Sequence, residues 1–247
     1  MCASAGRVEP GSERGAAMKR HAEGRPAPPS VTKSDLREAA LTLFAERGYH
    51  GTSLKEIAQE LGIRTPSLYN HMESKASLLR EIVLETLHYV VRDFECALAE
   101  SSDPAERLRA ATAVYAYRHA THRREALVVN QEAIHLEEPD LTVAQQTRRQ
   151  HENGFRQLII DGQRAGVFTV DSPKVASFAI REMCVSVARW FRSDGPLSAA
   201  DVADQYSAFA LGIVGAGGAA RLRSNPLTPP VSGGAYCLET SAHRPSV

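Results

Sequence analysis

The 247-residue chain lacks several features that would narrow its function at once. Its 29 Lys and Arg residues balance its 29 Asp and Glu residues, so net charge favours no anionic partner, and any such partner must be met by a local patch. No uninterrupted apolar run approaches the ~20 residues of a membrane span, and the basic amino-terminal stretch lacks the apolar segment of a signal peptide. We therefore expect a cytoplasmic protein with no membrane partner.

Catalytic and metal-binding patterns are also absent from the sequence. The four cysteines are far apart and fit neither a metal nor a redox spacing, so we expect reduced thiols: Cys2, Cys96, Cys184 and Cys237. No G-x-S-x-G, H-E-x-x-H or phosphate-cradling Gly loop occurs, and "GAGGAA" near Gly215 follows no strand. His122, His135 and His151 share no ligand spacing. We expect no catalytic residue, no metal and no cofactor.

The two ends of the chain are poor in large apolar residues. Residues 1–30 are rich in Gly, Ala, Ser, Pro, Arg and Glu, and residues 224–247 have the same character. Such segments bury too little surface to order themselves, so we interpret them as a disordered arm and a disordered tail. Translation could start at Met1 or at Met18, and the sequence does not decide between them.

Between the two ends, only helical periodicity is found, and the predicted fold class is all-α. The expected helices cover about 32–47, two short stretches within 53–72, 74–100, 103–123, 124–136, 141–165, 173–192 and 199–222. We expect a three-helix DNA-binding domain over 31–77 and a helical bundle over 78–223 for ligand binding and dimerisation.

The stretch "GTSLKEIAQELGIRTPSLYNHMESK" contains two short helices with a tight turn between them. Ser53 and Glu56 form a capping-box pattern that begins the first helix. Gly62 turns the chain, Thr65 is expected to cap the second helix, and Pro66 suits its first position. Leu68 and Met72 are expected to anchor the second helix to the core. The pattern predicts a helix-turn-helix.

The second of these helices keeps its hydrogen-bonding residues on the outer side. They are Arg64, Thr65, Pro66, Ser67, Tyr69, Asn70 and His71. A helix that reads the major groove needs such side chains, because Arg can pair with guanine, Asn can pair with adenine, and Thr or Pro can touch a thymine methyl group. Two other interpretations stay open: Tyr69 as a core aromatic and His71 as a solvated residue at a helix end.

The segment from about Asp35 to Leu79 resembles the DNA-binding domain of the tetracycline-repressor (TetR) family of bacterial regulators. The resemblance lies in "FAERGY", "TSLKEIA", "LG" and "SLYNHMESK", followed by an apolar run. It implies phosphate contacts for Thr52 and Lys75, and it implies that Tyr69 packs along the DNA backbone. Pro66 stands where many members have Gly or Ala, and Met72 stands where many have an aromatic residue. Lys75 could alternatively sit in the first turn of a long helix without touching DNA.

Two later helices are predicted to pair with their copies in a twofold dimer. The stretch 173–192 is apolar around more than half of its circumference, and the last helix places Ala203, Ala210 and Gly217 at seven-residue steps that permit close approach. The alternative is that both helices are internal. A dimer would hold two reading helices over a palindrome with half-sites ~10 bp, or a multiple of it, apart.

The remaining helices are expected to enclose an effector pocket, because TetR-like regulators are generally repressors released by a ligand. Polar and aromatic residues that could face it are His88, Tyr89, Arg92, Tyr115, Arg118, His119, Asn130, Arg164, Arg189 and Trp190. The segment "REMCVSVARWFRSDGPLS" is similar to actinobacterial TetR-like repressors of lipid, sterol or aromatic-acid catabolism, and this implies an acyl-coenzyme A thioester as effector. The competing functions are a helical enzyme and a protein-interaction module without DNA binding.

Overall fold

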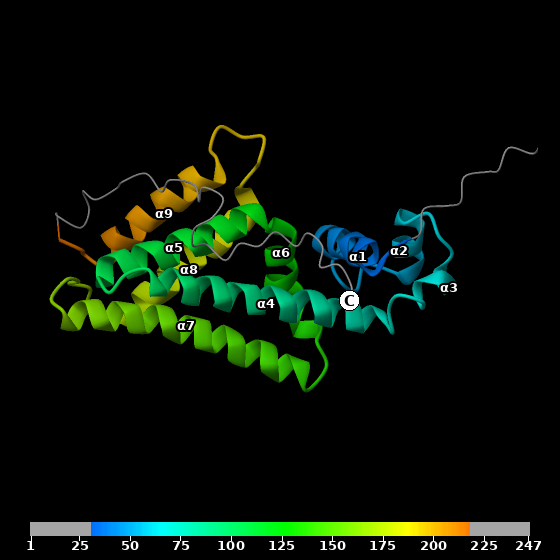
Figure 1. The fold of residues 1–247 in the computed structure, drawn as a ribbon, viewed down its shortest axis with the longest axis horizontal. Coiled ribbons are helices and arrows are strands. Elements are labelled where there is room, and N and C mark those ends of the chain that lie inside the picture. The colour runs from blue at the N-terminus through cyan, green and yellow to red at the C-terminus, as the bar shows by residue number, and fades with distance from the viewer. Residues whose placement is uncertain (1–30, 218–247) are drawn as a thin grey trace, which may run out of the picture. The chain divides into compact units, whose positions relative to one another are not determined.

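The computed structural model describes residues 31–217, which belong to one compact unit. The predicted arm (1–30), the whole predicted tail (224–247) and positions 218–222 of the last expected helix lie outside the described residues. Within them the fold is all-α, as predicted, with nine α-helices and one short 3-10 helix (Figure 1). In order these are α1 Lys33–Arg47, α2 Leu54–Glu60, α3 Thr65–Leu68, α4 Lys75–Ala99, α5 Pro104–Thr121, α6 Arg123–Glu132, η1 Ala133–His135, α7 Asp140–Arg164, α8 Pro173–Trp190 and α9 Ala199–Ile213.

Local capping signals define where most helices begin. The side chains of Thr32, Ser53, Ser74 and Ser198 each accept a hydrogen bond from the backbone N–H three residues on, and the side chain of that third residue accepts the backbone N–H of the cap residue. These reciprocal bonds satisfy backbone groups that a helix start leaves free. The Ser53 pair confirms the box predicted for α2. Gly48, with φ 78°, ends α1 as predicted.

Two predicted helix boundaries were wrong. The N-cap of α3 is Arg64, not Thr65, and Pro66 occupies the second helical position. The last helix, expected to reach position 222, ends at Ile213, because Gly215 adopts φ 64° and the chain turns there.

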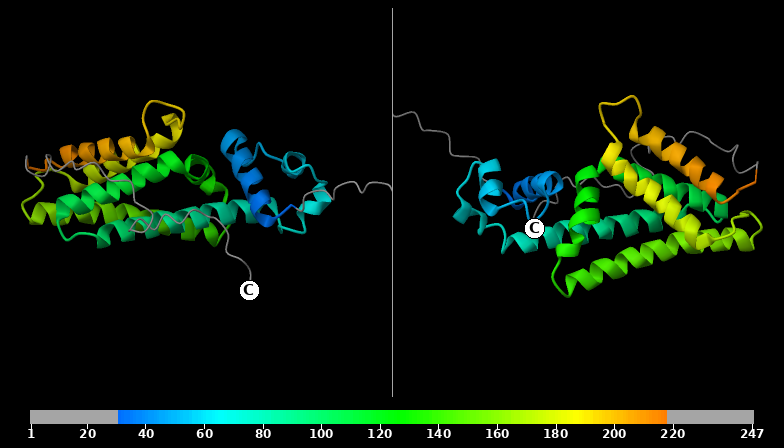
Figure 2. Two further views of the ribbon diagram at one scale, coloured as in Figure 1. Left: turned by 45° about the horizontal axis from the view of Figure 1, so that its top comes forward. Right: turned by 180° about the vertical axis from the view of Figure 1, so that it is seen from behind.

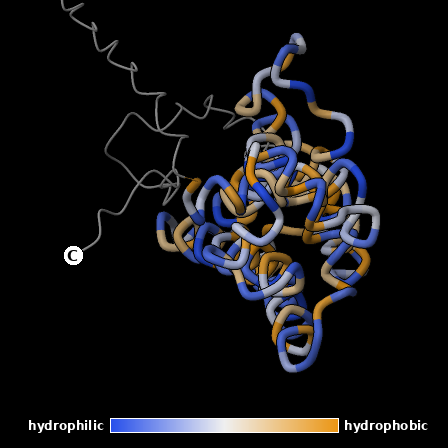
Figure 3. The backbone as a smooth tube through the Cα atoms, turned by 90° about the vertical axis from the view of Figure 1, so that its right-hand side faces the viewer, coloured by the Kyte–Doolittle hydropathy of each residue, from blue (hydrophilic) through white to orange (hydrophobic). Residues whose placement is uncertain are grey.

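The first three helices lie at one end of α4, and the other helices form a bundle along the rest of it (Figures 1 and 2). In the bundle, α5 packs against α4, α7, α8 and α9. Each helix carries both apolar and polar residues (Figure 3). The buried residues recur at helical spacing, as in α4 and α5, so that one side of the helix packs into the interior. None of the helices between residues 31 and 217 has the length and apolar content needed to cross a membrane.

Two large apolar cores share α4. The first core joins α1–α3 to the amino-terminal half of α4 and also contains residues from later in the chain: Val128, Val129, Ala133, Leu136 and Ala144. The second core lies in the bundle, around Phe94, Tyr115 and Phe155. The amino-terminal helices, which we call the head (residues 31–74), therefore bury part of their inner surface against α6, η1 and α7.

Candidate DNA-binding surface, effector cavity and the joint between them

The front of α3 is held outwards by two buried anchors. Leu68 and Met72 are buried in the first core, as predicted. Between them Tyr69 is 57% exposed, which rules out its interpretation as a core aromatic. Around it Arg64, Pro66 and Asn70 are exposed, and Thr65, Ser67 and His71 are partly exposed. All seven predicted reading residues are thus accessible on one short segment.

Thr52 has an internal role that conflicts with the predicted phosphate contact. Its side chain is 1% exposed, and its hydroxyl donates to the backbone oxygens of Leu43 and Gly48. A buried hydroxyl that already donates its proton cannot reach a DNA phosphate, so this prediction is corrected for the side chain.

Lys75 also supports the loop between α1 and α2. Its ammonium donates to the backbone oxygens of Tyr49 at 2.9 Å and Thr52 at 2.8 Å, and it lies 4.3 Å from the centre of the Tyr49 ring. Two of the three N–H donors of this lysine are therefore engaged inside the protein. A cation in the first turn of a helix is mildly unfavourable because of the helix dipole, and these contacts offset that effect for Lys75 in α4.

The outer faces of α8 and α9 expose large apolar side chains. On α8 these are Val175, Phe178 and Trp190, and on α9 they are Phe209 and Ile213. Phe209 is 54% exposed and Trp190 is 44% exposed. We call these five residues the α8/α9 face. Large exposed apolar side chains on two helices that pack together are typical of protein–protein interfaces.

The small residues of α9 do not belong to that face. Ala203 and Ala210 are buried within the chain, where α9 packs against α5, and Gly217 lies beyond the end of the helix. The prediction that these three residues mediate close approach of two protomers was therefore wrong. The exposed residues of α9 lie on its opposite side.

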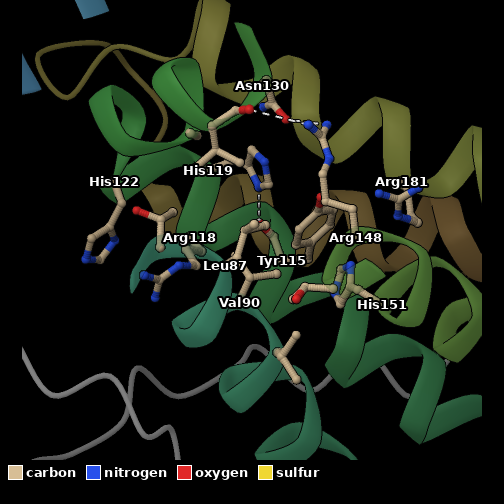
Figure 4. A pocket seen from close by; sticks show the side chains of 15 residues that line it. Leu87, Val90, Tyr115, Arg118, His119, His122, Asn130, Arg148, His151 and Arg181 are labelled. Atoms are coloured by element: carbon tan, nitrogen blue, oxygen red, sulfur yellow. Dashed lines mark hydrogen bonds between the residues drawn. The ribbon is translucent and has the colours of Figure 1, made fainter. Parts of the chain in front are cut away.

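A cavity opens between α4, α5, α6, α7 and α8 (Figure 4). The cavity has a volume of about 40 Å³, counted as the space that the centres of water molecules can occupy. This is room for roughly three waters. Four of the predicted ligand residues line it: Tyr115, Arg118, His119 and Asn130. The structure brings these four together from α5 and α6.

The other predicted ligand residues do not line this cavity. His88, Arg164, Arg189 and Trp190 are exposed on outer helix faces, and Tyr89 and Arg92 lie beside the cavity, where Arg92 and Arg118 both contact the Tyr89 ring. Several lining residues were not predicted, among them Arg148, His151 and Arg181. Arg181 lies on the same polar side of α8 as the exposed Lys174 and Arg189, so the sequence pattern gave no sign that it would face inwards.

Buried histidines on the cavity wall are neutral at pH 7. Burial, together with a smaller contribution from the positive charge of Arg181, lowers the pKa of His119 to about 4 and the pKa of His151 to about 3. His119 Nδ1 lies 2.8 Å from the backbone oxygen of Tyr115, to which it donates. Burial also raises the pKa of the Cys184 thiol, which is consistent with the predicted reduced state.

The loop after α1 forms a joint with α6 and η1. Glu132 of α6 accepts the backbone N–H of Tyr49 at 3.0 Å, and His50 Nε2 lies 3.1 Å from His135 Nδ1. The rings of Tyr49 and His135 are stacked, with centres 5.9 Å apart. We call these residues the head joint.

Helix α6 contributes to both the head joint and the cavity. Its residues Ala126, Val129 and Asn130 line the cavity, and Glu132 follows within one turn. Arg124 at its other end pairs with Glu38 of α1 at 2.9 Å. A displacement of α6 by a ligand would therefore act directly on the head.

Among the described residues, no group of three His, Cys, Asp or Glu side chains could hold a metal ion. Several charged side chains of α1, α4 and α5 form ion pairs between helices. Arg118 of α5 lies 2.6 Å from Asp93 of α4, and both are buried. Lys33 and Arg37 of α1 pair with Glu81 and Glu85 of α4.

Comparison with known families matches both parts of the chain. Residues 36–82 match the model "Bacterial regulatory proteins, tetR family", and residues 101–214 match the model "Tetracyclin repressor-like, C-terminal domain". The HTH-type transcriptional repressor KstR2 of Mycolicibacterium smegmatis is 30% identical over 193 residues, which cover 76% of this chain and 92% of that protein.

Solved structures give the same result. The ketosteroid transcriptional regulator KstR2 of Mycobacterium tuberculosis has a TM-score of 0.69 at 27% identity, with 73% of this chain and 93% of that chain covered. AibR, solved in complex with isovaleryl coenzyme A and operator DNA, shares the fold with a TM-score of 0.65 at 22% identity, over 75% of this chain and 99% of that chain. The relatives are transcriptional regulators and not enzymes. The chain belongs to the TetR family of bacterial transcription regulators.

Proposed function

We propose that the protein is a homodimeric repressor in the cytoplasm that binds a palindromic operator and is released by a small-molecule effector. The observation that carries this proposal is the exposed front of α3, where Tyr69 and its polar neighbours stand clear of two buried anchors. Side chains of these types can donate to base edges and to phosphates.

A dimer is supported by the α8/α9 face. Association of two copies through this face would remove its five apolar side chains from water. Each Å² of apolar surface buried in this way would stabilise the dimer by about 25 cal/mol. A closed twofold pairing would bring the same patch of each protomer into contact and fix the distance between the two α3 segments.

Release by an effector is supported by the double role of α6. A ligand that enlarges the cavity would press on Val129 and Asn130, and Glu132 would carry the displacement to Tyr49. The effector must bind more tightly to the conformation that does not fit the operator, so that operator binding in turn weakens effector binding. The class expected from the sequence is an acyl-coenzyme A thioester, for which this cavity would have to open further.

Operator binding is tested by footprinting and gel-shift titration on the promoter of the protein's own gene. The logarithm of the binding constant should fall linearly with the logarithm of salt concentration, with a slope of about −0.9 for each phosphate neutralised. Arg64→Ala, at the entrance of α3, should weaken binding. The matched control is Arg164→Ala, an exposed arginine at the far end of α7, which should bind as the wild type does.

Release is tested by repeating the titration with candidate thioesters. A dimeric protein that shows no preference for any promoter fragment over random duplex at low salt would overturn the proposal.

A further inference from the structure

The cavity wall carries positive charge that the surrounding carboxylates do not balance. Three of its lining residues are arginines, Arg118, Arg148 and Arg181, and none of the lining residues is Asp or Glu. Asp93 pairs with Arg118, and Glu152 pairs with Arg181, from outside the lining.

Each of the two carboxylates is shared between two guanidinium groups. Asp93 lies 2.6 Å from Arg118 and 3.4 Å from Arg92. Glu152 lies 2.5 Å from Arg156 through one oxygen, and its other oxygen is 3.8 Å from Arg181. Glu152 is therefore not available to neutralise Arg181 fully.

Arg148 has only neutral hydrogen-bond partners within the described residues. It donates to the backbone oxygen of Val129 at 3.4 Å and to the side-chain oxygen of Asn130 at 3.3 Å, as Figure 4 shows for Asn130. Arg181, which shares Glu152 with Arg156, and Arg148 therefore leave a local surplus of positive charge on the wall. A charge held away from water without an opposite partner is costly, so such a wall favours an anion.

His151 adds a hydrogen-bonding group that has no use inside the fold. Its side chain is 5% exposed, it lines the cavity, and its Nε2 has no hydrogen-bond partner in the described part of the chain. Figure 4 shows His151 and Arg181 on the same side of the pocket. With its proton on Nε2, the neutral ring is a donor without an acceptor.

Tyr115 lines the same cavity as the two arginines. Burial raises the pKa of its hydroxyl, and the positive charges of Arg181 and Arg148 oppose this rise. Two cationic forks, one phenol and one imidazole thus converge from α5, α7 and α8. Arginine forks match the two oxygens of a carboxylate.

We propose that the effector carries a carboxylate that binds in this cavity, among Arg148, Arg181 and His151. The inference deepens the proposed function and rests on it for the regulatory role of the occupant. The volume of about 40 Å³ suits a carboxylate with a short carbon stem. A neutral acid derivative cannot replace it, because it leaves the surplus charge unpaired.

The first experiment uses acetate as the probe and follows the melting temperature of the full-length protein. Acetate should raise it, whereas acetamide, which has nearly the same shape without charge, and chloride, which lacks the second oxygen, should not. Arg181→Gln and Arg148→Gln should each lower acetate affinity at least tenfold. Arg164→Gln serves as the matched control and should respond to acetate as the wild type does. The difference between this control and the two cavity variants is free of the general effect of salt on stability.

The two cavity variants protect the test against misfolding. Arg148 is only partly buried and its partners are neutral, so Arg148→Gln should fold even if Arg181→Gln does not. Equal effects of acetate and acetamide, equal effects of acetate and chloride, or a normal acetate response in a folded Arg148→Gln protein would overturn the proposal.

A second arm identifies the source of the carboxylate. Succinyl-coenzyme A and butyryl-coenzyme A have acyl groups of similar length, and only the first ends in a carboxylate. Tighter binding of the succinyl form would assign a thioester of a dicarboxylic acid, and response to acetate alone would assign a free acid. Butyryl-coenzyme A that binds as well as succinyl-coenzyme A, in a protein that ignores acetate, would refute the carboxylate subsite.

Operator retention in the same samples separates the two proposals. Charge-dependent acetate binding in a protein that does not retain operator DNA would refute the proposed repressor and leave the anion subsite standing. Operator binding in a protein that does not discriminate between acetate and acetamide would refute the anion subsite and leave the proposed repressor standing.

Discussion

Replacement of Lys75 by Met removes an ammonium from a site where it holds two backbone oxygens and faces the Tyr49 ring. A hydrogen bond from a charged group contributes about 1.5–3 kcal/mol, and a cation–π contact at a partly exposed site contributes about 0.5–1 kcal/mol. Because Lys75 is partly exposed, the lower values apply, and Met preserves some of the packing on Tyr49. We expect a loss of about 2–4 kcal/mol in the free energy of unfolding.

The assay is thermal or urea unfolding of the protein, followed by circular dichroism. A loss of this size corresponds to a fall in the melting temperature of roughly 5–15 °C for a unit of about this length. The matched control is Lys55→Met on α2, an exposed lysine of the same head, which should leave the melting temperature unchanged.

The same variant separates an internal role for Lys75 from a phosphate contact. A lysine that neutralises one phosphate in each protomer contributes about 2 to the magnitude of the salt slope of a dimer. We expect operator affinity to fall because the loop is loosened, with little change in that slope. A Lys75→Met protein with unchanged stability and a slope reduced by about 2 would refute the structural assignment.

Tyr69→Ala should leave the melting temperature unchanged and weaken operator binding by about tenfold, which is one contact of about 1.4 kcal/mol, as gel-shift titration can measure; an unfolded variant would contradict this. Phe209→Glu or Trp190→Glu should shift the protein from dimer to folded monomer in analytical ultracentrifugation, because each places a charge in the α8/α9 face; dimers that persist in both variants would place the interface elsewhere. Acidification from pH 6.5 to about 4 should lower the free energy of unfolding by about 1.4 kcal/mol per pH unit for each of His119 and His151, because the unfolded state binds protons that the buried rings do not. His151→Gln should flatten that dependence in urea titrations at a series of pH values, and an unchanged pH dependence would count against a neutral buried ring.

The sequence predicted the head in detail because local chemistry determines it. Ser53 with Glu56 and the apolar spacing of Leu68 and Met72 act over a few residues, and all were found where expected. The roles of Thr52 and Lys75 were not predictable in this way. Both depend on backbone oxygens that only the folded loop brings to these side chains.

The cavity was only partly predictable because its wall is assembled from several helices. Tyr115, Arg118 and His119 lie within two turns of α5 and were found together. Arg181 and Trp190 both lie on α8, and no local signal says which faces inwards. The packing of α8 against α5 and α7 decides that Arg181 lines the cavity and Trp190 faces outwards.

The first apolar core takes part of its lining from Val128, Ala133 and Leu136, which lie more than forty residues after the head ends. An excised fragment of residues 31–74 would expose the surface that these side chains cover. Chimaeric regulators that graft this head onto another family member should therefore also transplant the facing surface of α6 and η1. Calorimetry of the intact protein should accordingly show head and bundle melting in one cooperative transition.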